Sequence, residues 1–337
     1  MTIAIPTYNR ASLLRQAIAS AIAQTHSNLE ILVFDNASSD ETPSIIREFD
    51  DRRIKYWCHP INIGLTANWE GALSAATGTF FLMLSDDDRL APQAITDLLH
   101  CISGPDQGGV AFAYGACEIR DTHIAASRLS HSAPGLESAV KYRIGYLRGQ
   151  RINYPSATLF RTADIRSVGG YISHGKAPID IGMAFAVSHC HPLVAYTGTT
   201  TTYYLFHPEN FTSSLSINTH LESMCCLAEK AVNLMEGMGN SDAQETIRAA
   251  AWSKAALLAH LTLQGHFNGS INTYQLFLNL WQRRSFFKQF GCRTIPLNMA
   301  IRFALFHLLG VRSLSLKTFR AFCNGLLIKF TKKGPTQ

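Results

Sequence analysis

The sequence predicts an α/β fold built on an open, mostly parallel sheet with helices on its faces. Near-continuous apolar runs such as LEILVFD (29–35) and TFFLML (79–84) are typical of strands that are buried on both faces of a parallel sheet. Segments with apolar residues at helical spacing separate these runs. Strand and helix therefore alternate up to about residue 105, as in a sheet of parallel βα units.

The expected elements follow in chain order. Residues 2–5 are expected to form a strand that ends at Pro6, and apolar residues then recur at helical spacing from Leu13 to Ile22. The next expected elements are a strand at 29–35, a helix from Ser39-Asp40 to about Phe49, a strand at 53–57, a helix at 66–76 and a strand at 79–84. Further strands are expected at 109–116, 156–161 and 193–206, and further helices at 139–148 and 180–189.

The charge divides the chain into two regions. Thirty Lys and Arg residues against twenty-four Asp and Glu give a formal net charge of +6. Residues 1–245 hold all twenty-four acids and seventeen of the bases, whereas residues 246–337 hold thirteen bases and no acid. Only helical patterns follow residue 216. We therefore predict an α/β catalytic region at 1–215 and a basic, all-helical region at 216–337.

The spacing of the cysteines indicates the cellular compartment of the protein. The eight cysteines include no Cys-x-x-Cys pair and show no regular spacing, which favours reduced thiols in a cytosolic protein. The residues after Met1 read as a strand, so no signal peptide is expected.

Polar clusters follow four successive strands, at the edge where an open α/β sheet binds its ligands. They are PTYNR (6–10), Asp35-Asn36, NIG (62–64) and the aspartates of LSDDDRL (84–90). The absence of a G-x-G-x-x-G or G-x-x-x-x-G-K-S/T motif argues against a dinucleotide fingerprint and a P-loop. Three adjacent like charges repel each other, so the aspartates either cap a turn or helix or hold a divalent cation. Mg²⁺ takes one or two carboxylates together with substrate phosphates.

Several motifs together resemble the family 2 glycosyltransferases of the GT-A fold, over about residues 1–210. They are IAIPTYNR, LEILVFDNASSDET, NIGLTANWEGALSAATGTFFLMLSDDD, and VGGY followed by PID. The resemblance implies an inverting transferase that uses a nucleotide-sugar donor. It also implies that Pro6, Thr7, Tyr8 and Arg10 line the base and ribose. Asp35 would accept a hydrogen bond from the base, which favours a UDP or dTDP donor.

The resemblance assigns the remaining site residues as well. Asn62, Gly64, Asn68, Asp86 and Asp87 would complete the nucleotide-sugar site, and Asp86, Asp88 and His207 would hold Mg²⁺ or Mn²⁺. Ser85 stands where the family often has the first Asp of its motif, which leaves open which two of the three aspartates form the functional pair. Asp180, after Gly169-Gly170-Tyr171, would be the catalytic base; a helix N-cap is the alternative role for this residue.

Two other activities stay open at this level. A nucleotidyltransferase on a related scaffold would use similar carboxylates, but it should carry a Gly-rich, basic loop after the first strand. A non-catalytic nucleotide-sugar-binding relative would not need to keep Asp35, Asp86–Asp88 and Asp180. The expected partners are thus a nucleotide-sugar donor and a glycan or lipid-linked acceptor, as in polysaccharide biosynthesis.

The basic region allows several interpretations. Its apolar side chains could cover the sheet while its charges are merely solvated. Alternatively, residues 283–333 could bind an anionic membrane surface, where each Lys or Arg contributes about 1 kcal/mol. A nucleic-acid partner is not expected, because no recognised motif accompanies the charge. The hypothesis is a cytoplasmic enzyme, peripheral on the inner face of the cytoplasmic membrane, that extends a lipid-linked glycan.

Overall fold

The structure of the protein is a computed structural model. It describes residues 1–103, 109–121, 127–129, 134–148, 150–151, 153–172, 178–207, 217–234, 242–247 and 249–250. The chain divides into two compact units, residues 1–259 and 260–337, and the second unit lies outside the described residues.

The first half of the sheet is parallel, as the sequence predicts. Its strands are β1 (Thr2–Thr7), β2 (Glu30–Asp35), β3 (Ile54–Cys58) and β4 (Phe80–Met83), in the spatial order β3-β2-β1-β4. The helices between them are α1 (Ala11–Ile22), α2 (Thr42–Arg47) and α3 (Leu65–Ala75). Pairing of β1 with β2 and β4, and of β2 with β3, is parallel throughout.

One predicted boundary in this half is wrong. Pro6 was expected to end the first strand, but it lies inside β1 and pairs in register with Phe34. Proline lacks an N–H group but accommodates extended backbone. The strand continues to Thr7, whose carbonyl accepts the N–H of Asn36 at 3.0 Å.

The second half of the sheet is mixed. Its strands are β5 (Arg89–Leu90), β6 (Val110–Asp121), β7 (Ser127–Leu129), β8 (Gly135–Ser138), β9 (Thr158–Arg161) and β10 (Leu193–Phe206). Strand β9 is antiparallel to both β4 and β6, while β10 is parallel to β6 and antiparallel to β5 and β8. The prediction of a mostly parallel sheet is therefore wrong beyond β4. The reason is that a strand buried on both faces shows the same run of apolar residues whether it is parallel or antiparallel to its neighbours.

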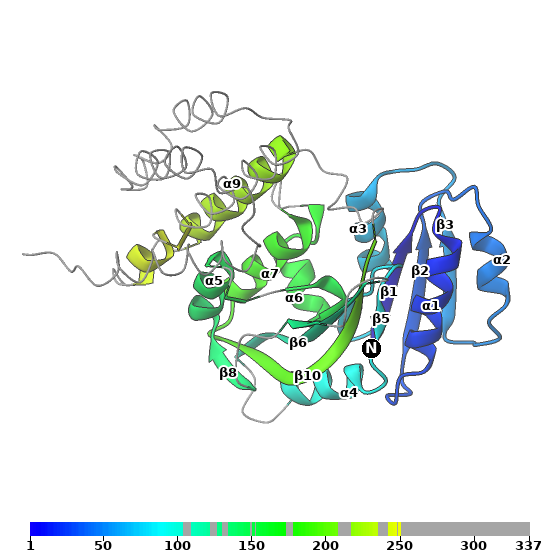
Figure 1. The fold of residues 1–337 in the computed structure, drawn as a ribbon, viewed down its shortest axis with the longest axis horizontal. Helices are drawn as coiled ribbons and strands as arrows, with labels where there is room; N and C mark the ends of the chain where they lie inside the picture. The colour runs from blue at the N-terminus through cyan, green and yellow to red at the C-terminus, as the bar shows by residue number, and fades with distance from the viewer. Residues whose placement is uncertain are drawn as a thin grey trace, which may run out of the picture. The chain divides into compact units, whose positions relative to one another are not determined.

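Helices cover both faces of the sheet (Figure 1). The remaining ones are α4 (Ala94–Ile102), α5 (Ala139–Leu147), α6 (Thr162–Ser167), α7 (Ile179–His189) and α9 (Ile217–Asn233), with a 3-10 turn at Pro155–Ala157. Alternate strand residues point to opposite faces. Ile3 and Ile5 therefore pack with α1, α2 and α4, whereas Ala4 shares the other core with α3, α5, α6, α7 and α9.

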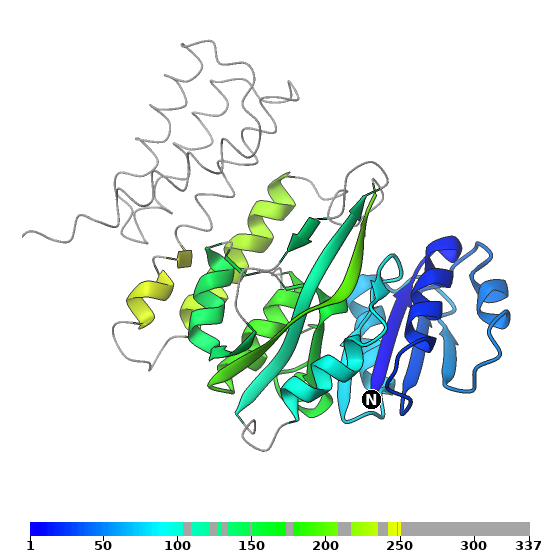
Figure 2. The same ribbon diagram turned by 60° about the horizontal axis from the view of Figure 1, so that its bottom comes forward.

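The long strand β10 connects the far side of the sheet to the end of β4. It runs beside β6 along its length (Figure 2). Near its end it also pairs with β5, Thr202 with Leu90 and Tyr203 with Arg89. Register shifts interrupt its pairing with β6 on either side of Thr200. The end of β10 is thereby brought next to the segment that follows the aspartates.

The predicted boundary at residue 215 stays a prediction. Helix α9 begins just after it, and Leu227, Ala228 and Ala231 of this helix are buried in the core that also contains α7. Most of the predicted all-helical region, from residue 251 onward, lies outside the described residues. Among the residues that the structure does describe, no helix is both long and apolar enough to cross a membrane.

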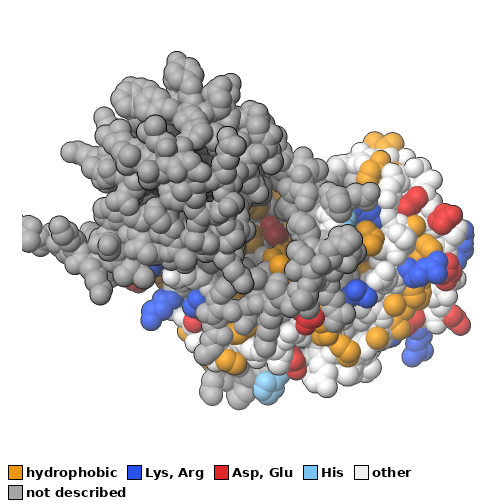
Figure 3. Space-filling model, in the orientation of Figure 1, with side chains coloured by type: hydrophobic (Ala, Val, Ile, Leu, Met, Phe, Trp, Pro, Cys, Tyr) orange, Lys and Arg blue, Asp and Glu red, His pale blue; other side chains and the backbone are white. Residues whose placement is uncertain are grey.

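The surface of the N-terminal elements carries a mixture of charges. Figure 3 shows acidic and basic side chains interspersed over this part of the molecule, on the right of the view. This mixture contrasts with residues 246–337, whose charged side chains are all basic.

Candidate active site

The carboxyl ends of β1 and β4 bring Thr7 and the aspartates together. Because the two strands are neighbours and parallel, both chains leave the sheet at the same edge. The hydroxyl of Thr7 donates to Oδ2 of Asp86 at 2.8 Å. This contact confirms that the loops after the first and fourth strands meet, as their order in the sequence suggested.

Arg10 bridges two of the aspartates. Its Nη1 lies 3.1 Å from Oδ1 of Asp86 and 2.9 Å from Oδ2 of Asp87. Arg10 occupies the N-cap position of α1, so the first turn of this helix holds the guanidinium against the carboxylates. The side chains of Asp86 and Asp87 are 7% and 8% exposed, which reduces solvent screening of both ion pairs.

His207 reaches the same group from the end of β10. Its Nε2 lies 3.2 Å from Oδ2 of Asp87. The sequence prediction grouped His207 with Asp86 and Asp88, and the structure places its ring within hydrogen-bond distance of Asp87. The pairing of β10 with β5 explains the approach, because β5 begins immediately after Asp88.

Ser156 is a site residue that the sequence analysis missed. Its hydroxyl donates to Oδ2 of Asp88 at 2.6 Å and accepts the N–H of Ser85 at 3.0 Å. Ser156 is fully buried in the 3-10 turn before β9. It lies some seventy residues from the aspartates in the chain, so no local spacing pattern could have indicated the contact.

The three carboxylates carry more negative charge than their neighbours offset. Burial and then the charge of Asp87 raise the pKa of Asp86 to about 6, against the effects of Arg10 and Thr7. The same two causes raise the pKa of Asp88 to about 8, against the Ser156 hydroxyl and, less strongly, the N–H of Leu205. Such shifts mean that the buried carboxylates lack sufficient positive partners.

A divalent cation fits this environment. Oδ1 of Asp88 is buried and accepts no hydrogen bond of normal geometry from the described residues, so it is a free oxygen ligand of the kind that Mg²⁺ prefers. No three His, Cys, Asp or Glu side chains within the described ranges form a preformed metal site. Both oxygens of Asp86 are already engaged by Thr7 and Arg10. Asp88 therefore suits the role of metal ligand better than Asp86.

Asp35 ends the neighbouring strand β2 and is buried. It is 0% exposed, and its Oδ1 accepts the N–H of Ser38 at 2.8 Å. Its Oδ2 accepts the hydroxyl of Tyr56, on the adjacent strand β3, at 2.7 Å. Each carboxylate oxygen has a second lone pair, so Asp35 keeps acceptor capacity for a ligand. Tyr56 was not predicted to take part in the site.

Hydrogen bonds join the loops after β1 and β2. The N–H of Asn9 donates to Oγ of Ser38 and the N–H of Ser39 to Oδ1 of Asn9, both at 2.8 Å. This arrangement leaves the neighbouring Tyr8 side chain 45% exposed. Pro6, by contrast, is buried inside β1.

The loop after β3 is organised by amide side chains. Asn36 donates to Oδ1 of Asn62 at 2.8 Å, and the same oxygen accepts the N–H of Gly64 at 2.9 Å. Gly64, with a φ of 84°, then begins α3. Asn68 is 2% exposed, and its amide donates to the carbonyl of Phe34 at 3.0 Å. The structure thus places Asn68 in the packing between α3 and β2.

Asp180 lies in the first turn of α7. Pro178 is at the N-cap and the helix begins at Ile179, so the alternative role of Asp180 as N-cap is wrong. Burial raises the pKa of Asp180, while the N–H groups of Ile181 and of Asp180 itself favour its charged form. Negative charge in a first helical turn is also stabilised by the helix dipole.

Two partly buried tyrosines interact electrostatically with acidic residues of the predicted site. After burial, the charge of Asp180 contributes to the raised pKa of Tyr146, and so does Tyr154. The charge of Asp88 contributes in turn to the raised pKa of Tyr154. Electrostatic interactions thus connect Asp180 with Tyr146, Tyr146 with Tyr154, and Tyr154 with Asp88.

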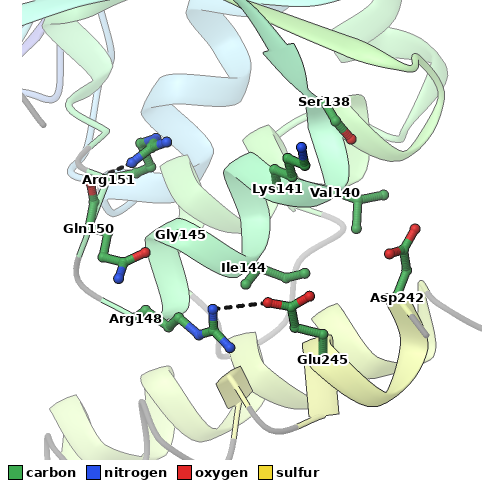
Figure 4. Close-up of a pocket in the computed structure, with 10 residues that line it drawn as sticks. All are labelled: Ser138, Val140, Lys141, Ile144, Gly145, Arg148, Gln150, Arg151, Asp242 and Glu245. Atoms are coloured by element: carbon green, nitrogen blue, oxygen red, sulfur yellow. Dashed lines mark hydrogen bonds and ion pairs between the residues drawn. The ribbon is translucent and has the colours of Figure 1, made fainter. Parts of the chain in front are cut away.

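A pocket of about 290 Å³ lies elsewhere, between α5 and residues 242–247 (Figure 4). Its lining includes the charged residues Lys141, Arg148, Asp242 and Glu245, and Arg148 forms an ion pair with Glu245 at 3.0 Å. None of the predicted site residues lines it. Cavity size alone therefore does not locate the candidate active site.

The comparisons with known proteins agree with the motifs. Residues 2–166 match the model of glycosyl transferase family 2. A GalNAc(5)-diNAcBac-PP-undecaprenol beta-1,3-glucosyltransferase of Campylobacter jejuni is 36% identical over 122 residues, which cover 35% of this chain and 38% of that protein. The Escherichia coli UDP-Glc:alpha-D-GlcNAc-diphosphoundecaprenol beta-1,3-glucosyltransferase WfgD is 31% identical over 119 residues, 35% of this chain and 46% of that protein. The matched segments thus span less than half of these relatives.

A solved structure shows the same fold over a longer stretch. The crystal structure of S. aureus TarS 1-349 in complex with UDP-GlcNAc covers 88% of this chain and 90% of its own, with a TM-score of 0.59 and 16% identity. The family match favours a glycosyltransferase over the nucleotidyltransferase that the sequence pattern left open. Residues 2–166 of the chain therefore form a family 2 glycosyltransferase domain.

Proposed function

We propose that the protein is an inverting glycosyltransferase that moves a hexose from a nucleoside diphosphate sugar to a hydroxyl of a lipid-linked glycan. The hydrogen-bonded group of Thr7, Arg10, Asp86, Asp87 and His207 carries this proposal. It gathers three loops at the carboxyl edge of the sheet, where open α/β folds bind their ligands. Asp35, at the end of the neighbouring strand β2, accepts a hydrogen bond from Tyr56 of β3.

The relatives suggest the two substrates. WfgD is named for a UDP-Glc donor and a diphosphoundecaprenol acceptor, and the Campylobacter jejuni relative for an undecaprenol-linked acceptor. An undecaprenyl diphosphate-linked saccharide is therefore the acceptor class that we propose. The acceptor capacity of Asp35 matches the N3–H donor of uracil or thymine, and WfgD is named for a UDP-linked donor. UDP or dTDP is therefore the nucleotide that we propose.

The reaction is a single displacement. The acceptor oxygen forms a bond to the anomeric carbon as the bond from that carbon to the diphosphate breaks, and the nucleoside diphosphate leaves. Asp180 takes the proton of the acceptor hydroxyl, and its raised pKa makes it a stronger base than an exposed aspartate. Arg10 keeps Asp86 and Asp87 in place beside the diphosphate.

Asp88, with Asp87 beside it, would hold Mg²⁺ or Mn²⁺. When bound, the cation would offset the charge that develops on the leaving diphosphate. This assignment is tested by the thermal shift of the purified protein with UDP, dTDP or GDP, each with Mn²⁺ or with EDTA. We expect UDP or dTDP to raise the melting temperature with Mn²⁺ and to have little effect with EDTA. Equal stabilisation in EDTA would contradict the metal, and a preference for GDP would contradict the base assignment.

We also propose that the basic region of residues 283–333 holds the enzyme on the cytoplasmic membrane. Its support is the charge of the sequence, because residues 246–337 contain thirteen bases and no acid. A lipid-linked acceptor lies at such a surface. Flotation with anionic and neutral vesicles at low and high salt tests the idea. Binding to anionic vesicles that salt weakens is expected, and binding that ignores lipid charge would contradict it.

A further inference from the structure

Two hydrogen bonds engage the carboxylate of Asp35, one on each oxygen. The N–H of Ser38 donates to Oδ1 at 2.8 Å, and the hydroxyl of Tyr56 donates to Oδ2 at 2.7 Å. Asp35 itself is 0% exposed. A ligand that binds this carboxylate therefore reaches it only after a neighbouring group has moved.

The backbone donor is the fixed one of the two. Oγ of Ser38 accepts the N–H of Asn9 at 2.8 Å, and Oδ1 of Asn9 accepts the N–H of Ser39 at the same distance. Asn9 and Ala37 have φ values of 52° and 65°, a left-handed backbone that a residue with a side chain keeps only where its surroundings hold it. Displacement of the Ser38 N–H would break up both loops.

Tyr56 is the donor that a ligand can replace. Among the described strands, β3 pairs with β2 alone, so Tyr56 lies at the edge of the sheet. It is in register with Val33, two residues before Asp35, and its side chain reaches along the strand to the carboxylate. Because Tyr56 is 37% exposed, its hydroxyl can turn to water when it leaves Asp35.

The hydroxyl of Tyr56 and the N3–H of uracil or thymine are equivalent donors for this carboxylate. Each offers one hydrogen to an acceptor oxygen. An incoming uracil therefore replaces the hydrogen bond that it displaces, and the buried oxygen is not left unsatisfied. Cytosine cannot make this exchange, because its N3 is an acceptor.

We propose that the Tyr56 hydroxyl holds the place on Asp35 that the N3–H of the donor nucleotide takes, so that donor binding exchanges one hydrogen bond for another. Tyr56 thus keeps the buried carboxylate paired between turnovers and competes with the base for it. This inference rests on the proposed function, because it takes Asp35 as the acceptor for the base.

The test compares variants of the full chain. Tyr56→Phe removes the hydroxyl and keeps the ring. Tyr114→Phe is the matched control, because the hydroxyl of Tyr114 donates to Oε1 of Glu137 at 2.8 Å, in a similar tyrosine–carboxylate pair outside the predicted site. Calorimetry measures the affinity of each protein for UDP and for CDP with Mn²⁺. The melting temperature is recorded without nucleotide and with saturating UDP.

We expect Tyr56→Phe to bind UDP about 3–10-fold more tightly than wild type, the scale of one net hydrogen bond, and CDP within about twofold. Its melting temperature without nucleotide should fall by about 2–4 °C, and UDP should narrow that difference. Tyr114→Phe should lose a similar amount of stability but bind UDP within about twofold of wild type. A purely structural role of Tyr56 would lower stability without tightening the binding of UDP.

A crystal structure of the wild-type protein with UDP and Mn²⁺ tests the exchange without any variant. We expect N3 of the base within about 3 Å of Oδ2 of Asp35, with the Tyr56 hydroxyl turned away. Unchanged or weaker UDP binding in Tyr56→Phe, equal tightening for CDP, or a complex in which Tyr56 keeps its hydrogen bond to Asp35 would overturn the proposal.

Failure of the proposed function has a different signature. In that case the wild-type protein binds no UDP, or binds UDP and CDP equally well. The assignment of Asp35 to the base would then be wrong, and the exchange with Tyr56 would fall with it. Clear preference of the wild type for UDP, together with unchanged UDP affinity in Tyr56→Phe, would overturn the exchange alone.

Discussion

The hydroxyl of Ser156 lies 2.6 Å from Oδ2 of Asp88 and at the same time accepts the N–H of Ser85. One fully buried side chain therefore fixes both the carboxylate and the backbone at the start of the aspartate segment. It does so at Ser85, the position where the resembled family often carries its first aspartate. The contacts of Ser156 with Asp88 and with the backbone of Ser85 thus hold this segment in place without a carboxylate at position 85.

Ser156→Ala should lower both stability and activity. It leaves a buried acceptor on Asp88 and a backbone donor on Ser85 without this partner, and an unsatisfied buried polar group costs about 1–3 kcal/mol. We expect a loss of unfolding free energy in this range by urea denaturation, together with a lower transfer rate. The control is Ser167→Ala, because Ser167 is an exposed serine that bonds only locally to the carbonyl of Asp164. Equal stability of the two variants would contradict the role of Ser156.

Arg10→Ala should weaken donor binding far more than Arg15→Ala. Arg10 contacts two buried carboxylates, whereas Arg15, on the same helix, is 51% exposed and pairs with a surface glutamate. Without Arg10, the repulsion between Asp86 and Asp87 increases and the diphosphate loses a nearby cation. We expect kcat/KM to fall about 10–100-fold in Arg10→Ala. Exposed pairs contribute about 0–1 kcal/mol, so Arg15→Ala should be close to wild type. Similar kinetics in the two variants would refute this assignment.

Gly170→Ala should destabilise the fold through two separate effects. One is the left-handed backbone, which costs about 1–3 kcal/mol for a residue with a side chain. The other is overlap of the new methyl group with the Glu70 carboxylate. Gly64→Ala isolates the first effect, because Gly64 also has a positive φ but has no atom within 4 Å of an added Cβ. Gly170→Ala should therefore lose more unfolding free energy than Gly64→Ala. The reverse order would show that Gly170 is not packed against Glu70.

Glu30 should make stability depend on pH in the acid range. Burial raises its pKa, but hydrogen bonds from Lys55, Thr2 and Thr77 outweigh that effect and lower the pKa from 4.5 to about 2. A lowered pKa stabilises the folded state above pH 4.5, and this contribution is lost as the pH falls from 4.5 to about 2.

Glu30→Gln should therefore be less stable than wild type at neutral pH, by about 1–2 kcal/mol. The difference should shrink as the pH falls toward about 2. Urea denaturation at a series of pH values measures it, with the exposed Glu48→Gln as control. A difference that stays constant with pH would mean that the charge of Glu30 contributes nothing.

The apolar periodicity of the sequence predicted the parallel half of the fold, because each strand there is followed directly by its own helix. It could not predict the antiparallel insertion of β9, since Leu159 and Phe160 are buried whichever way the strand runs. The two-residue strand β5 has too few residues for any pattern. Its pairing with β10 is nevertheless what brings His207 to Asp87.

The candidate site was partly predictable for a related reason. Thr7, Arg10 and the aspartates follow neighbouring strands, so strand order alone brings them together. Ser156 and Tyr56 act through tertiary contacts across 68 and 21 residues of chain. A serine or tyrosine far from the site in sequence is usually an ordinary surface or packing residue. Only the folded structure shows that these two contact residues of the site.

Asp180→Asn tests the central claim most directly. The substitution preserves the shape of the side chain but removes its ability to take a proton from the acceptor hydroxyl. We expect turnover with a UDP- or dTDP-hexose and an undecaprenyl diphosphate-linked acceptor to fall about 10²–10⁴-fold, with donor affinity and melting temperature near wild type. Because burial raises the pKa of Asp180 above 3.8, the acid limb of wild-type turnover should lie at a higher pH than for an exposed aspartate. Undiminished turnover in Asp180→Asn would contradict the assignment of Asp180 as the base.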